Sequence, residues 1–214
     1  MKVFRRQHPR RRADPTARTD YKDYRDELKQ DFNSRCGYTD CNDRWWGVKF
    51  QVDHFAPQNP KDITDPVIKR KFEDLTHTYT NLVYACPQVN NAKRNLWISN
   101  DPQEPIVGDE GLMDPCDFDY NEHFSRTDEG RIVAKDDSPV AAYMVDKLKL
   151  YLFRYELYWR IDELYERKKK LHELRSDQGV MSKYSAEINE LIADLDGEFQ
   201  KYFDYIGLNH NEIV

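Results

Sequence analysis

Three short segments decide the fold of this chain: Val52-Asp-His-Phe-Ala-Pro57, Asn81-Leu-Val-Tyr-Ala-Cys86 and Asn90-Asn-Ala-Lys93. The alternation of Phe50, Val52 and His54 predicts a β-strand that Pro57 ends. We expect this strand to be half of a hairpin, paired with the segment before Gly47. Residues 81–85 form a short apolar run, and Pro87 directly after it suits the first turn of a helix.

Helical periodicity appears on both sides of these segments. Upstream, Tyr21, Tyr24, Leu28 and Phe32 are spaced by three and four residues, which predicts one amphipathic helix. Asp20 is well placed to cap it. Downstream, a short helix is expected around residues 67–75, and residues 98–137 contain much of the remaining Gly and Pro and predict loops with short elements.

The chain is expected to be helical from Ser138 onward. One apolar stripe comprises Val145, Leu148, Leu152, Tyr155 and Trp159, and Gly179 interrupts the pattern. A second stripe keeps a four-three spacing and comprises Tyr184, Ile188, Leu191, Leu195, Phe199, Tyr202 and Ile206. Both stripes favour an antiparallel helix pair packed on the domain over a free coiled coil.

Charge is distributed unevenly and suggests three parts: a basic arm (1–20), a domain (21–137) and a helical region (138–214). Residues 1–100 carry 19 Lys and Arg against 13 Asp and Glu, whereas residues 101–214 carry 14 against 26. Six of the first twelve residues are basic and none is acidic. The first half is therefore expected either to meet a polyanion, with the arm ordering on binding, or to carry a solvated flexible arm.

Composition excludes several classes of protein. Apolar residues make up 39% and aromatic residues 13% of 214 residues, enough for a core that a disordered acidic chain lacks. No stretch approaches the roughly 20 apolar residues of a membrane span, and no apolar signal segment follows Met1. Four cysteines are too few for a disulfide scaffold at this length. We therefore expect a cytoplasmic protein without a membrane partner.

The order of the motifs resembles that of the HNH, or ββα-metal, endonuclease superfamily and its McrA-like members. The match covers about residues 36–94 and rests on Asp53-His54, Asn81-Leu82 and Cys86-Pro-Gln-Val-Asn90-Asn-Ala-Lys93. Flanking segments resemble the small HNH nuclease subunits of Septu-type and retron-associated anti-phage systems. These segments are Tyr24-Arg-Asp-Glu-Leu28, Leu112-Met-Asp-Pro115, His123-Phe124 and the helix around residues 148–160. The implied fold is α+β, with a ββα-metal core (motif core 36–94) between an N-terminal helix and a C-terminal antiparallel helical region.

The resemblance also implies roles for individual residues. His54 would be the general base, and Asp53 and Asn90 would ligate Mg²⁺ or Mn²⁺. Asn81 would brace the loop that carries the histidine. A histidine titrates near neutral pH, and a carboxylate with an amide oxygen is a sparse, hard ligand set that suits Mg²⁺.

Two further residues extend this site, and one alternative stays open. Lys93 and Arg94 follow Asn90 by three and four residues, so they share its helix face and are expected to hold the substrate phosphate. Asn91 is a rival to Asn90 as the metal ligand.

The cysteines depart from the family pattern. Many relatives carry two Cys-x-x-Cys pairs around a structural zinc ion. Here Cys36 and Cys41 are more widely spaced, Cys86 follows, and Val89 stands where a fourth ligand is expected; Cys116 could complete the set from a distance. Loss of the zinc is favoured, with a hydrophobic core in its place formed by Tyr38, Trp45, Trp46 and Val89.

The expected activity is metal-dependent hydrolysis of DNA phosphodiester bonds, which leaves a 5′-phosphate and a 3′-hydroxyl in this family. By analogy the chain would be an effector of bacterial anti-phage defence. It would act with an ATPase or sensor subunit, or self-associate through the acidic C-terminal helices. Two alternatives are an RNA- or tRNA-cleaving HNH nuclease and a non-catalytic nucleic-acid-binding assembly module.

Overall fold

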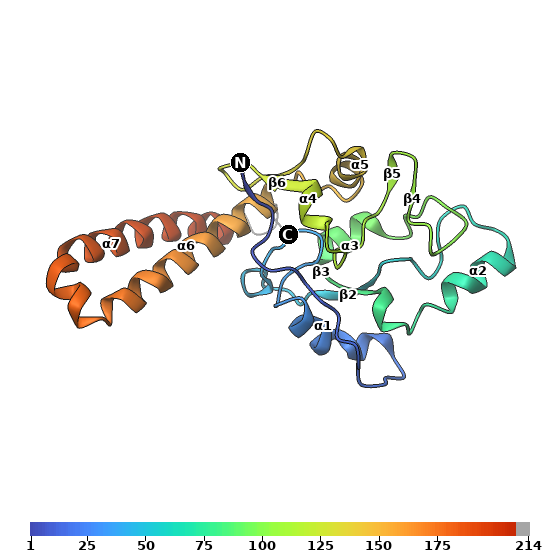
Figure 1. The fold of residues 1–214 in the computed structure, drawn as a ribbon, viewed down its shortest axis with the longest axis horizontal. Coiled ribbons are helices and arrows are strands. Elements are labelled where there is room, and N and C mark those ends of the chain that lie inside the picture. The colour runs from blue at the N-terminus through green and yellow to red at the C-terminus, as the bar shows by residue number, and fades with distance from the viewer. Residues whose placement is uncertain (209–214) are drawn as a thin grey trace.

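The computed structural model of the chain describes residues 1–208. Its elements are β1 (Lys2–Val3), η1 (Tyr21–Tyr24), α1 (Arg25–Asp31), η2 (Asp43–Trp45), β2 (Gln51–His54), α2 (Pro66–Glu73), η3 (Tyr79–Asn81), β3 (Leu82–Ala85), α3 (Pro87–Lys93), β4 (Ile106–Val107), β5 (Glu110–Gly111), α4 (Tyr120–His123), β6 (Phe124–Arg126), β7 (Ile132–Ala134), α5 (Pro139–Lys147), α6 (Phe153–Arg175) and α7 (Gln178–Leu208), where η marks a 3₁₀ helix. The fold is mixed, with helices around three small antiparallel sheets (Figure 1).

The centre of the molecule is the antiparallel pair β2–β3 followed by α3. Asp53 pairs with Val83 and His54 with Leu82. The expected strand is therefore confirmed, but its partner is not the segment before Gly47. Nearly thirty residues separate the two strands, so a local turn signal could not reveal the pairing.

The helix before the motif forms as its spacing predicts. The Asp20 carboxylate accepts a hydrogen bond from the Lys22 backbone and caps η1, which runs directly into α1. Leu28 and Phe32 are buried, and α1 packs against β3. The short helix expected at residues 67–75 is also confirmed, as α2.

The basic segment 1–20 is not a separate arm. Lys2 and Val3 form β1, which pairs with β6, and Phe4 is buried against Tyr120 and Phe124. The segment thus runs across the body of the domain, contrary to the expectation of an arm that orders on binding (Figure 1).

Internal partners account for most of the positive charges of this segment. Arg11 forms a two-pronged ion pair with Asp114, at 2.9 and 3.0 Å. Arg12 pairs with Asp31, and Arg5 donates to the carbonyls of Pro115 and Gly37. Arg5, Arg11 and Arg12 are thus held by internal partners and serve the fold, whereas Arg10 is exposed.

The C-terminal region is helical, as expected, but its first stripe is not one helix. Lys149 has a φ of 53°, which breaks the chain between α5 and α6. Helices α6 and α7, here called the helical hairpin, are antiparallel neighbours that extend away from the body (Figure 1). Trp46 stacks on Tyr158 at the hairpin base, with ring centroids 4.6 Å apart. Residues 209–214 of the expected helical region lie outside the described residues.

None of the helices within residues 1–208 combines the length and the apolar character that a membrane span requires.

Candidate functional site

A polar cleft of about 450 Å³ opens where η1, the end of β2 and α3 meet. Asp53, His54, Asn90 and Arg94, four of the residues expected in the site, line this cleft. Asn81 and Lys93 are buried and are not among its lining residues. The fold thus brings together residues that lie about forty positions apart in the sequence.

The ring of His54 is held from two sides. Its Nε2 lies 2.9 Å from the carbonyl oxygen of Thr76, and its ring meets the ring of Tyr21 with centroids 4.4 Å apart. A carbonyl can only accept a hydrogen bond, so Nε2 carries the proton and Nδ1 is the acceptor. Burial lowers the pKa of His54 from its usual 6.5, against the opposing effects of the Thr76 carbonyl and Asp53.

Asp53 and His54 share the cleft because β2 ends at His54. Successive residues of a regular strand point to opposite faces, so both side chains can serve one site only where the strand ends or twists. Phe55 still donates its backbone N–H to the carbonyl of Asn81 at 2.8 Å. The pairing of β2 with β3 therefore continues as far as the residues that line the cleft.

Asn81 braces the loop that follows His54. Its Oδ1 accepts from the backbone N–H of Ala56 at 2.8 Å, and its Nδ2 donates to the carbonyls of Ala56 and Leu75 at 3.0 and 3.4 Å. The buried amide of Asn81 thus connects the loop after β2 with Leu75, the neighbour of the Thr76 residue that contacts His54. These contacts are those that the bracing role requires.

Lys93 does not line the cleft. Its side chain is fully buried, and its Nζ lies 3.3 Å from Oδ1 of Asp53 and donates to the carbonyl of His54 at 2.5 Å. The expectation that Lys93 contacts phosphate is therefore wrong. A lysine that packs beneath a buried carboxylate neutralises it, because an isolated buried charge is costly.

Tyr38 completes the surroundings of Asp53. Its hydroxyl donates to Oδ2 of Asp53 at 2.9 Å, and burial, together with the charge of Asp53, raises the pKa of Tyr38 well above its usual value. The phenol therefore stays protonated and remains a donor. Each carboxylate oxygen of Asp53 thus has one protein partner.

Helix α3 places Asn90 and Arg94 on the other side of the cleft. Asn90 donates its Nδ2 to Oε1 of Gln51 at 2.7 Å, which leaves its amide oxygen for other contacts. Arg94 is exposed, caps α3 with a φ of 46°, and donates its Nε to the carbonyl of Asn91. Asn91 also lines the cleft, so the structure does not remove it as a rival ligand.

The donor set fits one hard divalent cation. A carboxylate offers about four lone pairs, of which Tyr38 and Lys93 use two, and the Asn90 amide oxygen is a second hard donor. Two protein oxygens leave most of an octahedral shell to water and substrate, which is typical of Mg²⁺. No group of three or more His, Cys, Asp or Glu side chains within residues 1–208 is arranged to hold a metal.

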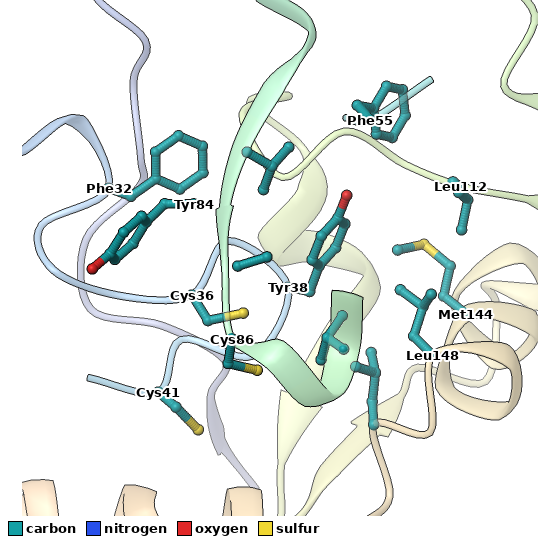
Figure 2. Close-up of a cluster of buried hydrophobic side chains, with 14 of the residues drawn as sticks. Phe32, Cys36, Tyr38, Cys41, Phe55, Tyr84, Cys86, Leu112, Met144 and Leu148 are labelled. Atoms are coloured by element: carbon teal, nitrogen blue, oxygen red, sulfur yellow. The ribbon is translucent and has the colours of Figure 1, made fainter. Parts of the chain in front are cut away.

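Three of the four cysteines lie in the hydrophobic core next to β3 (Figure 2). Cys36, Cys41 and Cys86 are buried free thiols. Burial raises the pKa of Cys36, but the hydrogen bonds from Cys86 and Thr39 outweigh it and lower the pKa to about 7. Burial raises the pKa of Cys41 to about 12, so that sulfur stays a thiol.

Three of the four residues expected to form a hydrophobic core near the cysteines lie in the core. Tyr38, Trp46 and Val89 are buried, whereas Trp45 is half-buried against Tyr165 and Phe199 of the helical hairpin. Cys116 is half-buried, and its carbonyl oxygen lies 3.0 Å from Nε2 of His8.

Sequence reasoning missed several residues of the site. Tyr21, Tyr38 and Thr76 contact His54 or Asp53, yet none of them belongs to the segments 52–57, 81–86 and 90–93 that carry the resemblance. His77 is exposed, and its ring lies 6.4 Å from that of Tyr21. No local signal distinguishes these residues, because tertiary packing brings them to the cleft.

No known protein-family model, curated protein or solved structure matches the chain.

Proposed function

We propose that this protein is a metal-dependent endonuclease of the HNH type that hydrolyses phosphodiester bonds in DNA. The observation that carries the proposal is the placement of His54, whose Nε2 bonds to a backbone carbonyl in the cleft that Asp53 and Asn90 also line. A base, a carboxylate and an amide around one opening are what hydrolysis of a phosphodiester requires. The order of the elements β2, β3 and α3 along the chain supports this proposal, because the resemblance to HNH nucleases implies two strands followed by a helix.

His54 acts as the general base at Nδ1. The hydrogen bond from Nε2 to the Thr76 carbonyl fixes the tautomer, and the lowered pKa keeps the ring neutral at pH 7. A neutral imidazole takes the proton of the attacking water, and the imidazolium that forms keeps its hydrogen bond to Thr76. The edge of Tyr21 limits rotation of the ring.

Asp53 and Asn90 hold the cation. When bound, a divalent ion neutralises the charge that develops on the phosphate and stabilises the leaving oxygen. Tyr38 and Lys93 fix the orientation of the Asp53 carboxylate from below, and Gln51 fixes the Asn90 amide. Arg94, exposed at the opening, is the candidate contact for the substrate phosphate.

A second candidate function is supported by the ion pair between Lys93 and Asp53. This pair satisfies the buried carboxylate without any cation. A domain that keeps the fold and the cleft but binds nucleic acid without cutting it would have the same arrangement.

The helical hairpin supports a further part of the proposal, an effector role in anti-phage defence beside an ATPase or sensor subunit. Its exposed side chains include five large apolar residues, Phe153, Tyr184, Leu191, Phe203 and Tyr205. Exposed apolar surface on an element that extends from the body is typical of protein docking (Figure 1). Self-association through this hairpin remains the alternative.

Cleavage of supercoiled plasmid tests the proposal. The wild-type protein is incubated with Mg²⁺, Mn²⁺ or EDTA beside His54→Ala and a matched control, His172→Ala, which alters an exposed histidine of α6. We expect nicking or linearisation with metal, retention in the control, and a loss of roughly 10²- to 10⁴-fold in His54→Ala. Labelled RNA digested in parallel separates the RNA-cleaving alternative. Equal cleavage by His54→Ala and wild type would refute the assignment of the base.

A further inference from the structure

The opening of the cleft is lined by side-chain amides. Asn59, Asn91 and Asn95, here called the amide rim, are exposed residues from two separate segments that line the same cleft. None of the hydrogen bonds within residues 1–208 uses their side-chain amides, whereas the neighbouring Gln58 donates to the Thr76 hydroxyl. Three amides with all their donors and acceptors available therefore surround the site.

An aromatic ring also lines the cleft. Tyr21 is half-buried, lines the cleft, and meets the His54 ring at 62°. This arrangement places a flat aromatic surface next to the group proposed as the base. Nucleobases stack on such rings whatever their sequence.

The cleft carries too few positive charges to bind several successive phosphates of a nucleic-acid backbone. Among its lining residues, Arg94 is the one exposed cation, and Lys93 neutralises Asp53. A surface that follows a nucleic-acid backbone presents several cations. Amides instead offer a donor and an acceptor side by side, which is the pattern that base edges complement.

We propose that the amide rim and Tyr21 bind one unpaired nucleobase beside the scissile phosphate. This inference rests on the proposed function and adds a substrate preference to it: the protein acts at single-stranded or locally unpaired nucleotides. In a duplex the Watson–Crick edge is occupied and the base faces are stacked, so neither Tyr21 nor the amide rim could reach them. The cleft, at about 450 Å³, has room for one nucleotide.

Binding in EDTA tests the base site separately from hydrolysis. Fluorescence anisotropy compares the affinity of the full-length protein for a labelled tetranucleotide and for the same sugar-phosphate chain without bases. We expect roughly tenfold weaker binding of the abasic chain, since it can neither stack on Tyr21 nor form base-edge hydrogen bonds with the amide rim. Asn91→Ala with Asn95→Ala should reduce this difference severalfold, and Tyr21→Leu should reduce it independently. Asn189→Ala, an exposed amide on α7, is the matched control.

Cleavage in Mg²⁺ tests the preference itself. A DNA duplex with a single-nucleotide bulge should be cut faster than the fully paired duplex, and the double amide variant should lose that ratio. If the protein cleaves DNA but binds the tetranucleotide and the abasic chain with equal affinity, the base site is refuted and the nuclease proposal is retained. If the protein binds the tetranucleotide more tightly than the abasic chain but cleaves no substrate, the nuclease proposal is refuted and the base site is retained. Failure to bind either chain would overturn both.

Discussion

The ammonium nitrogen of Lys93 lies 3.3 Å from Oδ1 of Asp53, and both side chains are buried. The same nitrogen donates to the His54 carbonyl, so one lysine touches both residues of the Asp-His pair. Removal of one partner of a buried ion pair leaves the other charge uncompensated. This contact therefore links the stability of the domain to the chemistry proposed for its cleft.

Replacement of Lys93 by methionine should destabilise the domain and make it sensitive to metal. We expect a loss of about 3–5 kcal/mol in the free energy of unfolding, measured in EDTA by urea denaturation. Saturating Mg²⁺ should restore more stability to Lys93→Met than to the wild type, because the cation then neutralises Asp53. Lys49→Met, which alters an exposed lysine, should behave as the wild type in both conditions. An identical response of both proteins to Mg²⁺ would argue against Asp53 as a ligand.

Replacement of Asn81 by alanine should loosen the loop that follows His54. The buried Ala56 N–H would lose its acceptor, which costs about 1–3 kcal/mol. Asn81→Asp keeps an acceptor for that N–H but sets a carboxylate oxygen against the carbonyls of Ala56 and Leu75, so it should also be less stable than the wild type. Urea denaturation ranks the three proteins, and equal stability of all three would show that the amide does not brace the loop.

Acid should weaken the attachment of the N-terminal segment to α1. Burial raises the pKa of Asp31, but the hydrogen bonds from Arg12 and Tyr79 outweigh it, so the pKa lies below the usual 3.8. For Glu27, contacts with Arg18 and Thr16 likewise outweigh burial and hold the pKa below 4.5. The stabilisation from a carboxylate with a lowered pKa is complete above the unfolded pKa and is lost as pH falls through the folded one.

The free energy of unfolding should therefore fall below about pH 4.5, where the unfolded chain takes up protons first. Denaturation with urea at pH 7 and at pH 3 measures this fall. Asp31→Asn should be less stable at pH 7 and show a smaller fall, whereas Asp26→Asn, at an exposed acid of the same helix, should keep the wild-type profile. A fall of unchanged size in Asp31→Asn would contradict the role of this carboxylate.

Replacement of Arg126 by methionine should remove hydrogen bonds that join β6 to three other segments of the chain. Its guanidinium is fully buried and donates to the carbonyls of Phe4, Thr39 and Gly130. The change would leave these acceptors unsatisfied, with an expected cost of about 3–5 kcal/mol from several lost charge-assisted hydrogen bonds. Hydrogen exchange should show faster exchange in β1 and β6 than elsewhere. Arg131→Met, at a mostly exposed arginine nearby, is the control and should leave exchange unchanged.

Arg126 and Lys93 also show what could not be read from the sequence. Lys93 was expected to face phosphate because it shares a helix face with Asn90, yet it is buried. Helical spacing states which residues share a face but not what that face meets. Arg126 attracts no notice in the sequence, because its three acceptors lie 4 to 122 positions away.

The sequence by itself determined the local elements around the motif. Apolar spacing, Asp20 and Pro87 placed α1, β2, α2 and α3 correctly, because helix and strand periods and helix ends depend on neighbouring residues. Only the tertiary structure decided that β2 pairs with β3, that most basic residues of the first twelve positions meet internal acids and carbonyls, and that Lys93 lies beneath Asp53. These outcomes depend on contacts between distant segments, where the cost of burying a charge selects its partner, and no local pattern carries that information.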